Sequence, residues 1–148
     1  MAVKKCVIFC AGEFFGLQRP IGAEDFVIAA DGGYAHTTKL GLTPDAVLGD
    51  FDSLGYTPEG AAVYPVEKDD TDAMLAVRLG LRKGCREFLI YGGLEGPRLD
   101  HTIANLQTLQ FLADRDARGV LVGKSQSATV LKNGSLSFPA GCRGHISL

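Results

Sequence analysis

Short apolar runs alternate with amphipathic stretches from the N-terminus to Arg118. Apolar runs bounded by glycine, proline or acidic residues are typical of buried strands. The runs expected to be strands cover residues 3–10, 26–30, 46–48, 62–66 and 87–91. Because helical patterns separate several of these runs, the order predicts an α/β fold. We expect a parallel open sheet with flanking helices in a Rossmann-like arrangement.

Helical periodicity occurs in three segments, which are residues 33–40, 71–83 and 99–113. In the second, Met74, Val77 and Leu81 recur at helical spacing, and Gly84 follows as a helix end. Asp70 or Thr71 is expected to cap its N-terminus. In the third segment, the apolar positions expected to face the core are Ile103, Leu106, Leu109 and Ala113.

After Arg118 the pattern changes to short strands joined by Gly, Asn and Ser turns, which is typical of all-β structure. The strands expected here cover residues 120–122, 128–131, 135–138 and 145–148. We therefore predict two domains, an α/β domain over residues 1–118 and the start of an all-β domain over residues 119–148.

Composition narrows the functional classes. The 148 residues are 46% hydrophobic with a net charge of −2, so a packed core is expected and nucleic acid is not an expected partner. No apolar run is long enough to span a membrane. The four cysteines contain no C-x-x-C pair and are expected to be free thiols, as in a cytosolic protein.

Acidic clusters follow four of the strand-like segments. They contain Asp31; Asp50 and Asp52; Asp69, Asp70 and Asp72; and Asp100. The carboxyl ends of parallel strands meet at one edge of an open sheet, where such folds bind ligands. Gathered carboxylates repel one another unless a cation lies between them. The clusters therefore predict a Mg²⁺ site that serves a phosphate-containing substrate.

Each acidic motif also has a purely structural interpretation. In extended backbone Asp50 and Asp52 face the same side and can bind one cation, but they can equally cap backbone N–H groups in a turn. In the segment from Lys68 to Asp72, one residue is expected to cap the helix. Capping leaves the additional carboxylates unexplained.

A glycine-rich loop over residues 92–98 precedes the last helix. Glycines allow backbone N–H groups to approach phosphates, Arg98 can neutralise phosphate charge, and Asp100 can act as a metal ligand or base. The alternative is a long turn in which Asp100 caps the helix. His101 is expected to pack rather than transfer protons, and Asn105 to orient a ligand or the loop.

Together the motifs resemble one family. They are ADGG (residues 30–33), the segment from Pro44 to Leu54 with GDFDSL, KDDTD (68–72) and GPRLDHTIAN (96–105). Over residues 29–109 their order and spacing closely resemble thiamine pyrophosphokinase. The resemblance implies transfer of diphosphate from ATP to the hydroxyl of thiamine, giving thiamine pyrophosphate and AMP. It also implies a Mg²⁺ cofactor and a homodimer.

The resemblance also implies roles for individual residues. Asp50, Asp52 and Asp72 match the metal-binding and catalytic carboxylates, with Asp100 close by. The residues expected to bind the nucleotide are Asp31, Gly32, Gly33, Lys68, Thr71, Gly92, Gly93 and Asn105. Arg98 is expected to contact phosphates, and either Asp72 or Asp100 to take up or orient the proton of the thiamine hydroxyl.

The chain departs from the family pattern at two places. Pro97 replaces a glycine, which removes one backbone N–H that could contact phosphate. The family has a C-terminal β-sandwich that completes the thiamine site, and residues 119–148 are expected to be only its beginning, without the usual Ser-Asn pair. We therefore expect further sequence beyond Leu148. The alternative functions are a diphosphokinase for another alcohol, such as a pterin, and a non-catalytic nucleotide-binding module.

Overall fold

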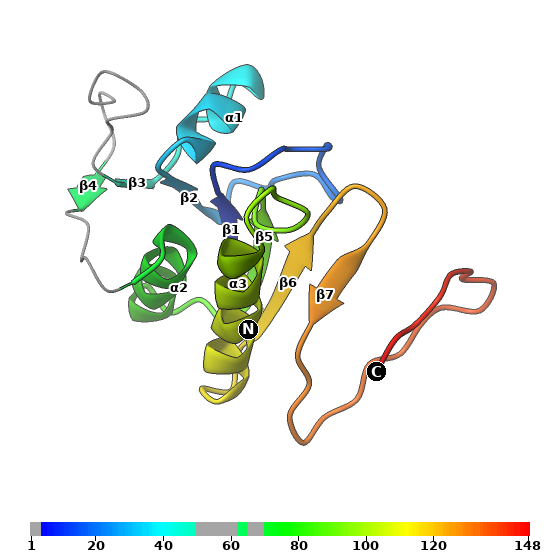
Figure 1. Ribbon diagram of the computed structural model, residues 1–148. Helices are drawn as coiled ribbons and strands as arrows, with labels where there is room; N and C mark the ends of the chain where they lie inside the picture. Colours follow the sequence, from blue (N-terminus) through cyan, green and yellow to red (C-terminus); the bar gives the residue numbers. More distant parts are fainter. Residues whose placement is uncertain (1–3, 50–61, 65–69) are drawn as a thin grey trace.

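The computed structural model describes residues 4–49, 62–64 and 70–148. In these residues, one sheet contains seven strands in the order β4-β3-β2-β1-β5-β6-β7 (Figure 1). The strands are β1 (Lys5–Phe9), β2 (Phe26–Ala30), β3 (Ala46–Leu48), β4 (Ala62–Tyr64), β5 (Glu87–Tyr91), β6 (Arg118–Val122) and β7 (Ser127–Thr129). The helices are α1 (Gly33–Lys39), α2 (Asp72–Arg82) and α3 (Leu99–Ala113).

Strands β1 to β6 pair in parallel, and only β7 among the described strands is antiparallel, against β6. From β1 the chain moves outward through β2, β3 and β4, and then returns to the other side of β1 to form β5. The strand order therefore reverses between β1 and β5. In open α/β sheets, ligands bind beyond the carboxyl ends of the strands at such a reversal.

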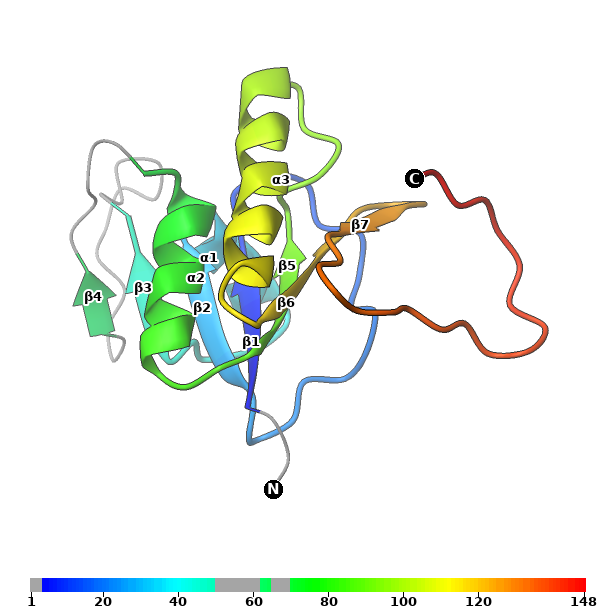
Figure 2. The ribbon, with the colours of Figure 1, turned by 90° about the horizontal axis from the view of Figure 1, so that it is seen from below.

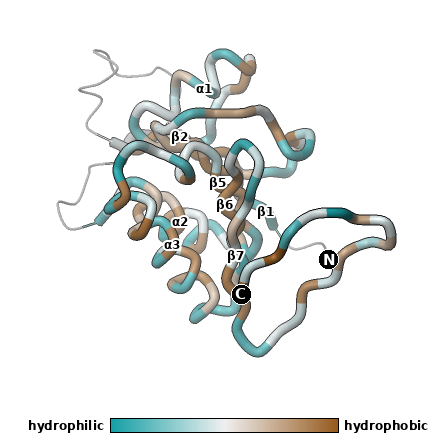
Figure 3. Tube along the Cα trace, turned by 45° about the vertical axis from the view of Figure 1, so that its right-hand side comes forward, coloured by the Kyte–Doolittle hydropathy of each residue, from teal (hydrophilic) through white to brown (hydrophobic). Residues whose placement is uncertain are grey.

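Helices cover both faces of the sheet. α2 and α3 pack on one face, where Cys6, Ile8 and Ile28 belong to the larger core cluster (Figure 2). α1 lies on the opposite face, where Val7 and Phe9 form a second cluster. Because the central strands are buried on both sides, they are apolar along most of their length, and only the first residues of β1 and β5, Lys5 and Glu87, are charged and exposed (Figure 3). This is why the apolar runs predicted the bounds of β2, β3 and β5 to the residue.

The expected inward face of α3 is confirmed at Leu109 but is wrong at Ile103 and Leu106. Ile103 and Leu106 are 47% and 38% exposed, whereas Asn105, Thr108, Leu109 and Leu112 are buried. Two of these buried side chains are polar, but each has a backbone acceptor: Asn105 donates to Gly93 O and Thr108 to Ala104 O. Those hydrogen bonds allow the polar residues to face the core, which apolar periodicity alone does not reveal.

The all-β domain expected after Arg118 is not what the described residues form. β6 and β7 extend the α/β sheet, because β6 pairs along its full length with β5. Residues 135–138 and 145–148, expected as strands, form none. Residues 131–148 are exposed and project away from the sheet in both views (Figures 1 and 2). The β-sandwich itself stays a prediction.

Cys6, Cys10 and Cys85 are buried thiols, and Cys142 is exposed. Cys6 and Cys10 face the same core cluster, as the alternation along β1 predicts. Within the described part of the chain, no helix has both the length and the apolar character that crossing a membrane requires.

Candidate functional site

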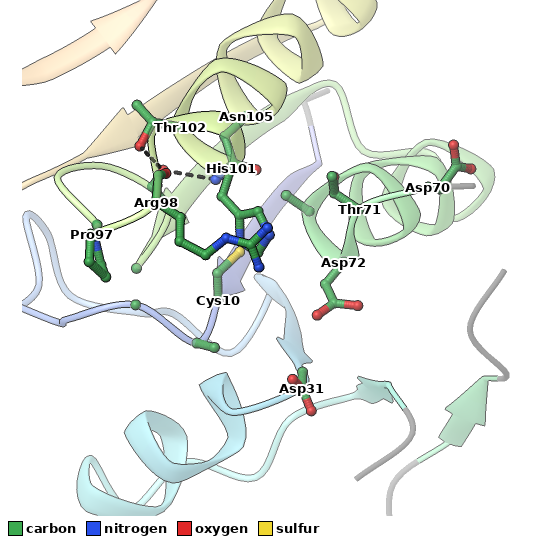
Figure 4. A pocket seen from close by; sticks show the side chains of 16 residues that line it. Cys10, Asp31, Asp70, Thr71, Asp72, Pro97, Arg98, His101, Thr102 and Asn105 are labelled. Carbon is green, nitrogen blue, oxygen red and sulfur yellow. Dashed lines mark hydrogen bonds between the residues drawn. The ribbon is translucent and has the colours of Figure 1, made fainter. Parts of the chain in front are cut away.

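A cavity of about 570 Å³ lies beyond the carboxyl ends of β1, β2 and β5, at the reversal of strand order. Its walls are residues 10–12 after β1, Asp31 after β2, the N-terminus of α2, and the loop from β5 into α3 (Figure 4). Two helix N-termini therefore face one space. Their unpaired N–H groups and their dipoles favour an anionic ligand.

Asp31 is held at the edge of this cavity by an unusual backbone. Its φ is 49°, in the left-handed region that few non-glycine residues adopt, and its N–H donates to Leu48 O at 2.6 Å. Gly33, two residues later, packs so closely that a Cβ would clash with Phe9 O. The ADGG motif thus forms a tight turn against the end of β1, which fixes where the Asp31 side chain begins.

The N-terminus of α2 supplies further residues. Thr71 is the cap, because its Oγ1 accepts a hydrogen bond from Met74 N at 3.2 Å. Asp70 also lines the cavity, and its carboxylate binds Arg78, with 3.3 Å between Oδ2 and Nε. Asp72 points into the cavity on the side of Asp31. Of the two expected caps, Thr71 is the one observed, and the carboxylate of Asp72 is directed toward Asp31.

The glycines after β5 are needed for contact between two loops. Gly92 has a φ of 76°, its carbonyl accepts from Gly12 N at 2.9 Å, and a Cβ on it would clash with Cys10 O. Gly93 packs against Asn105, whose Nδ2 donates to Gly93 O at 2.8 Å. The loops after β1 and β5 are therefore joined to each other and to α3.

Arg98 and His101 reach the cavity from the start of α3 (Figure 4). Arg98 also binds Asp100, with its Nε 3.2 Å from Oδ1 and its NH2 2.7 Å from Oδ2. This hydrogen-bonded pair, largely exposed, lowers the pKa of Asp100. Asp100 is not among the residues that line the cavity, and its carboxylate is directed to Arg98.

The buried wall of the cavity includes a thiol. Cys10 is 7% exposed, and burial raises its pKa to about 12, with a smaller contribution from the negative charge of Asp72. The thiol is therefore uncharged at neutral pH. Cys10 and Asp72 line the same cavity.

The structure brings most of the described candidate residues to one cavity, namely Asp31, Thr71, Asp72, Gly92, Gly93, Arg98 and Asn105. Gly32 and Gly33 belong to the adjoining turn and to α1. Asp50, Asp52 and Lys68 lie outside the described residues. The motifs had not indicated Cys10, Gly12 or Thr102 as cavity residues. Gly12 follows the first strand, so a strand-end search not limited to acidic residues would have found it.

Asp31 and Asp72 suit a hard cation. Mg²⁺ is held by oxygen atoms, commonly one or two carboxylates together with substrate phosphates and water. The two carboxylates face the same cavity, so the donor chemistry fits (Figure 4). Among the described residues, no three His, Cys, Asp or Glu side chains form a complete metal cluster. The sequence predicts Asp50 and Asp52 as further metal-binding carboxylates, and both lie outside the described residues.

Known proteins resemble the chain in both sequence and structure. The family model described as "Thiamin pyrophosphokinase, catalytic domain" matches residues 17–121. The solved thiamine pyrophosphokinase from Bacillus subtilis is 26% identical with a TM-score of 0.69, over 80% of this chain and 60% of that one. The Geobacillus thermodenitrificans thiamin pyrophosphokinase gives 26% identity and a TM-score of 0.66, over 80% and 59%.

An Enterococcus faecalis protein described as a thiamin pyrophosphokinase family protein is also 26% identical, with a TM-score of 0.65. That match covers 84% of this chain and 63% of the other. No curated protein matches the chain by sequence. The chain thus spans about three fifths of the length of the solved structures that it resembles.

Proposed function

Because the chain belongs to the thiamin pyrophosphokinase family, we propose that it transfers diphosphate from ATP to the hydroxyl of thiamine. The products are AMP and thiamine pyrophosphate. The observation that carries this proposal is one cavity with two chemically different parts. Two helix N-termini and Arg98 suit phosphates, and the carboxylates of Asp31 and Asp72 suit a cation bound to those phosphates.

The triphosphate of ATP is proposed to lie between the N-termini of α2 and α3. Free N–H groups of the first turns donate to phosphate oxygens there, and Arg98 offers a planar pair of donors. Arg98 is 63% exposed in its pair with Asp100, so it can exchange that carboxylate for a phosphate without opening the core. The reversal of strand order supports a Rossmann-like placement of the nucleotide across β1 and β5.

Asp31 and Asp72, together with Asp50 and Asp52, are the residues proposed to hold Mg²⁺. When bound, Mg²⁺ neutralises charge on the phosphate oxygens. The protein's own contribution is position, because the strained turn at Asp31 and the capped helix at Asp72 fix both carboxylates before ATP arrives.

The proposed acceptor of the thiamine hydroxyl proton is Asp72. Asp100 is the alternative, but its carboxylate accepts hydrogen bonds from Arg98 and does not line the cavity. Asp72 faces the cavity, where the hydroxyl must approach the β-phosphorus of ATP.

The test is product identity. Incubation with ATP, Mg²⁺ and thiamine should give equal amounts of AMP and thiamine pyrophosphate, measured by chromatography. Asp72→Asn should lower kcat/KM on the order of 100-fold, whereas Asp116→Asn should not, because Asp116 is exposed and its left-handed backbone also suits asparagine. A full-length, folded protein that forms ADP, or AMP only with a pterin alcohol, would refute thiamine as the acceptor. Binding of ATP with no transfer to any alcohol would favour a non-catalytic module.

We further propose a cytosolic homodimer in which a β-sandwich after β7 completes the acceptor site. Support comes from the buried free thiols, which suit a reducing compartment, and from apolar side chains left exposed beyond β7, including Leu136, Phe138 and Ile146. Light scattering of the full-length protein tests the dimer. A monomer at concentrations that support full activity would contradict it.

A further inference from the structure

Asn105 has an amide whose orientation is fixed. It lies on the second turn of α3, is 8% exposed, and lines the cavity. Its Nδ2 donates to Gly93 O at 2.8 Å. A carbonyl oxygen can only accept, so the nitrogen must be the amide atom that faces Gly93. The position of Oδ1 follows, because the amide group is planar and its Nδ2 atom is held by Gly93 O.

The oxygen of this amide is left for a ligand. No hydrogen bond in the described residues reaches Asn105 Oδ1, yet every fully buried side-chain polar atom among them has a partner. Oδ1 is therefore open to the cavity rather than sealed in the core. A ligand that displaces water from it must supply a donor, since an unpaired acceptor in a closed site costs free energy.

The chemistry of the amide defines that donor. Oδ1 repels phosphate oxygens, which are better placed beside Arg98 and the N-terminus of α2. Gly93 O takes one hydrogen of Nδ2, and no described residue accepts the other. An acceptor beside a donor matches an amino group next to a ring nitrogen, which is how asparagine reads adenine in nucleic acids.

We propose that Asn105 determines specificity by binding an amino group adjacent to a ring nitrogen on a heteroaromatic substrate. The inference rests on the proposed function, because both of its substrates carry this group, the adenine of ATP and the aminopyrimidine of thiamine. The bond to Gly93 makes the recognition rigid, since the amide cannot flip to donate to the oxo group of an oxo analogue without losing its own partner.

The test compares amino substrates with their oxo counterparts. Equilibrium binding, with Mg²⁺ present, is measured for ATP against inosine triphosphate and for thiamine against its 4-oxo analogue. The wild-type protein should prefer the amino member of one pair by roughly 5- to 150-fold, which is the discrimination expected of one two-point hydrogen-bonded contact. The pair that shows the preference identifies the bound ring. Absence of a preference in both pairs overturns the inference without any variant.

Asn105→Ser then assigns the preference to this residue. It should bind the oxo member as the wild-type protein does and lose the preference for the amino member. Thr108→Val is the matched control, because Thr108 is a buried polar residue of the same helix that does not line the cavity. Equal weakening of both members by Asn105→Ser would indicate a role only in holding the loop, and would overturn the inference. If the protein prefers the amino member but forms no thiamine pyrophosphate, the proposed function is refuted and the inference about Asn105 is not.

Discussion

At the scale of single residues, only a few carboxylates contribute negative charge near the cavity. Cys10 could add another negative charge to the cavity, but burial prevents this by raising its pKa to about 12. Asp100 is ionised, but its charge is paired with Arg98. The charge that faces the ligand therefore comes from side chains such as Asp72.

The state of Cys10 is open to a direct test. With iodoacetamide at pH 8, the exposed Cys142 should react first, and Cys10 should react slowly, because its thiolate fraction is on the order of 10⁻⁴. Mass spectrometry of a digest after short exposure reads out each site. Cys142→Ser should remove the fast reaction. Rapid labelling of Cys10 in the folded protein would contradict the structure.

At the scale of elements, Thr71 links the stability of α2 to the shape of the site. Its hydroxyl caps the helix at Met74 N and also lines the cavity. Thr71→Ala should destabilise the protein by about 1 kcal/mol, while Thr71→Ser, which keeps the hydroxyl, should cost only a few tenths. Urea unfolding measures both. Equal stability of the Ala variant and the wild type would mean that the cap contributes nothing.

Hydrogen bonds to Asp25 stabilise the end of the long loop between β1 and β2. This carboxylate accepts from Arg19 NH1 at 2.8 Å and from Gly22 N at 2.8 Å. Burial raises its pKa, but the hydrogen bonds from Arg19 and Gly22 outweigh burial, so the net pKa is below the usual value.

A lowered folded-state pKa fixes the sign of the pH effect. The contribution of Asp25 to stability is present above its unfolded-state pKa of about 3.9 and is lost as the pH falls through the lower folded-state value. Asp25→Asn should therefore cost about 1 kcal/mol at pH 7 and less at about pH 3, below the unfolded-state pKa. Denaturant unfolding at the two pH values gives the difference. A cost that is the same at both would show that the charge of Asp25 is irrelevant.

Apolar runs predicted most elements because the sheet is buried on both faces. The bounds of β2, β3, β5 and α3 agree with the structure to the residue. The predicted buried face of α3 was partly wrong because apolar periodicity could not include Asn105 and Thr108. These two polar residues are buried because backbone carbonyls accept their hydrogen bonds. The strands expected after β7 fail for a related reason, since a pattern of short apolar runs does not say what those runs pair with.

At the scale of the whole molecule, the reversal of strand order is what assembles the site. Sequence motifs placed carboxylates and glycines at strand ends, and parallel pairing explains why they meet. The motifs could not show that β1 and β5 are neighbours, and so did not identify Gly12, which bonds to Gly92 across that junction. The carboxylates and glycines of the site were therefore predictable from local patterns. The contacts that pack the strand-end loops together were not.

The central claim is that ATP binds in this cavity, with its phosphates at Arg98. Calorimetric titration of ATP with excess Mg²⁺ tests it most directly. We expect one-to-one binding by the wild-type protein, and equal binding by Arg82→Leu, which removes an exposed arginine at the far end of α2. Arg98→Leu should weaken binding by roughly 10- to 150-fold through loss of charge-assisted hydrogen bonds. Unchanged affinity of Arg98→Leu, or no binding by the folded wild-type protein, would contradict the account.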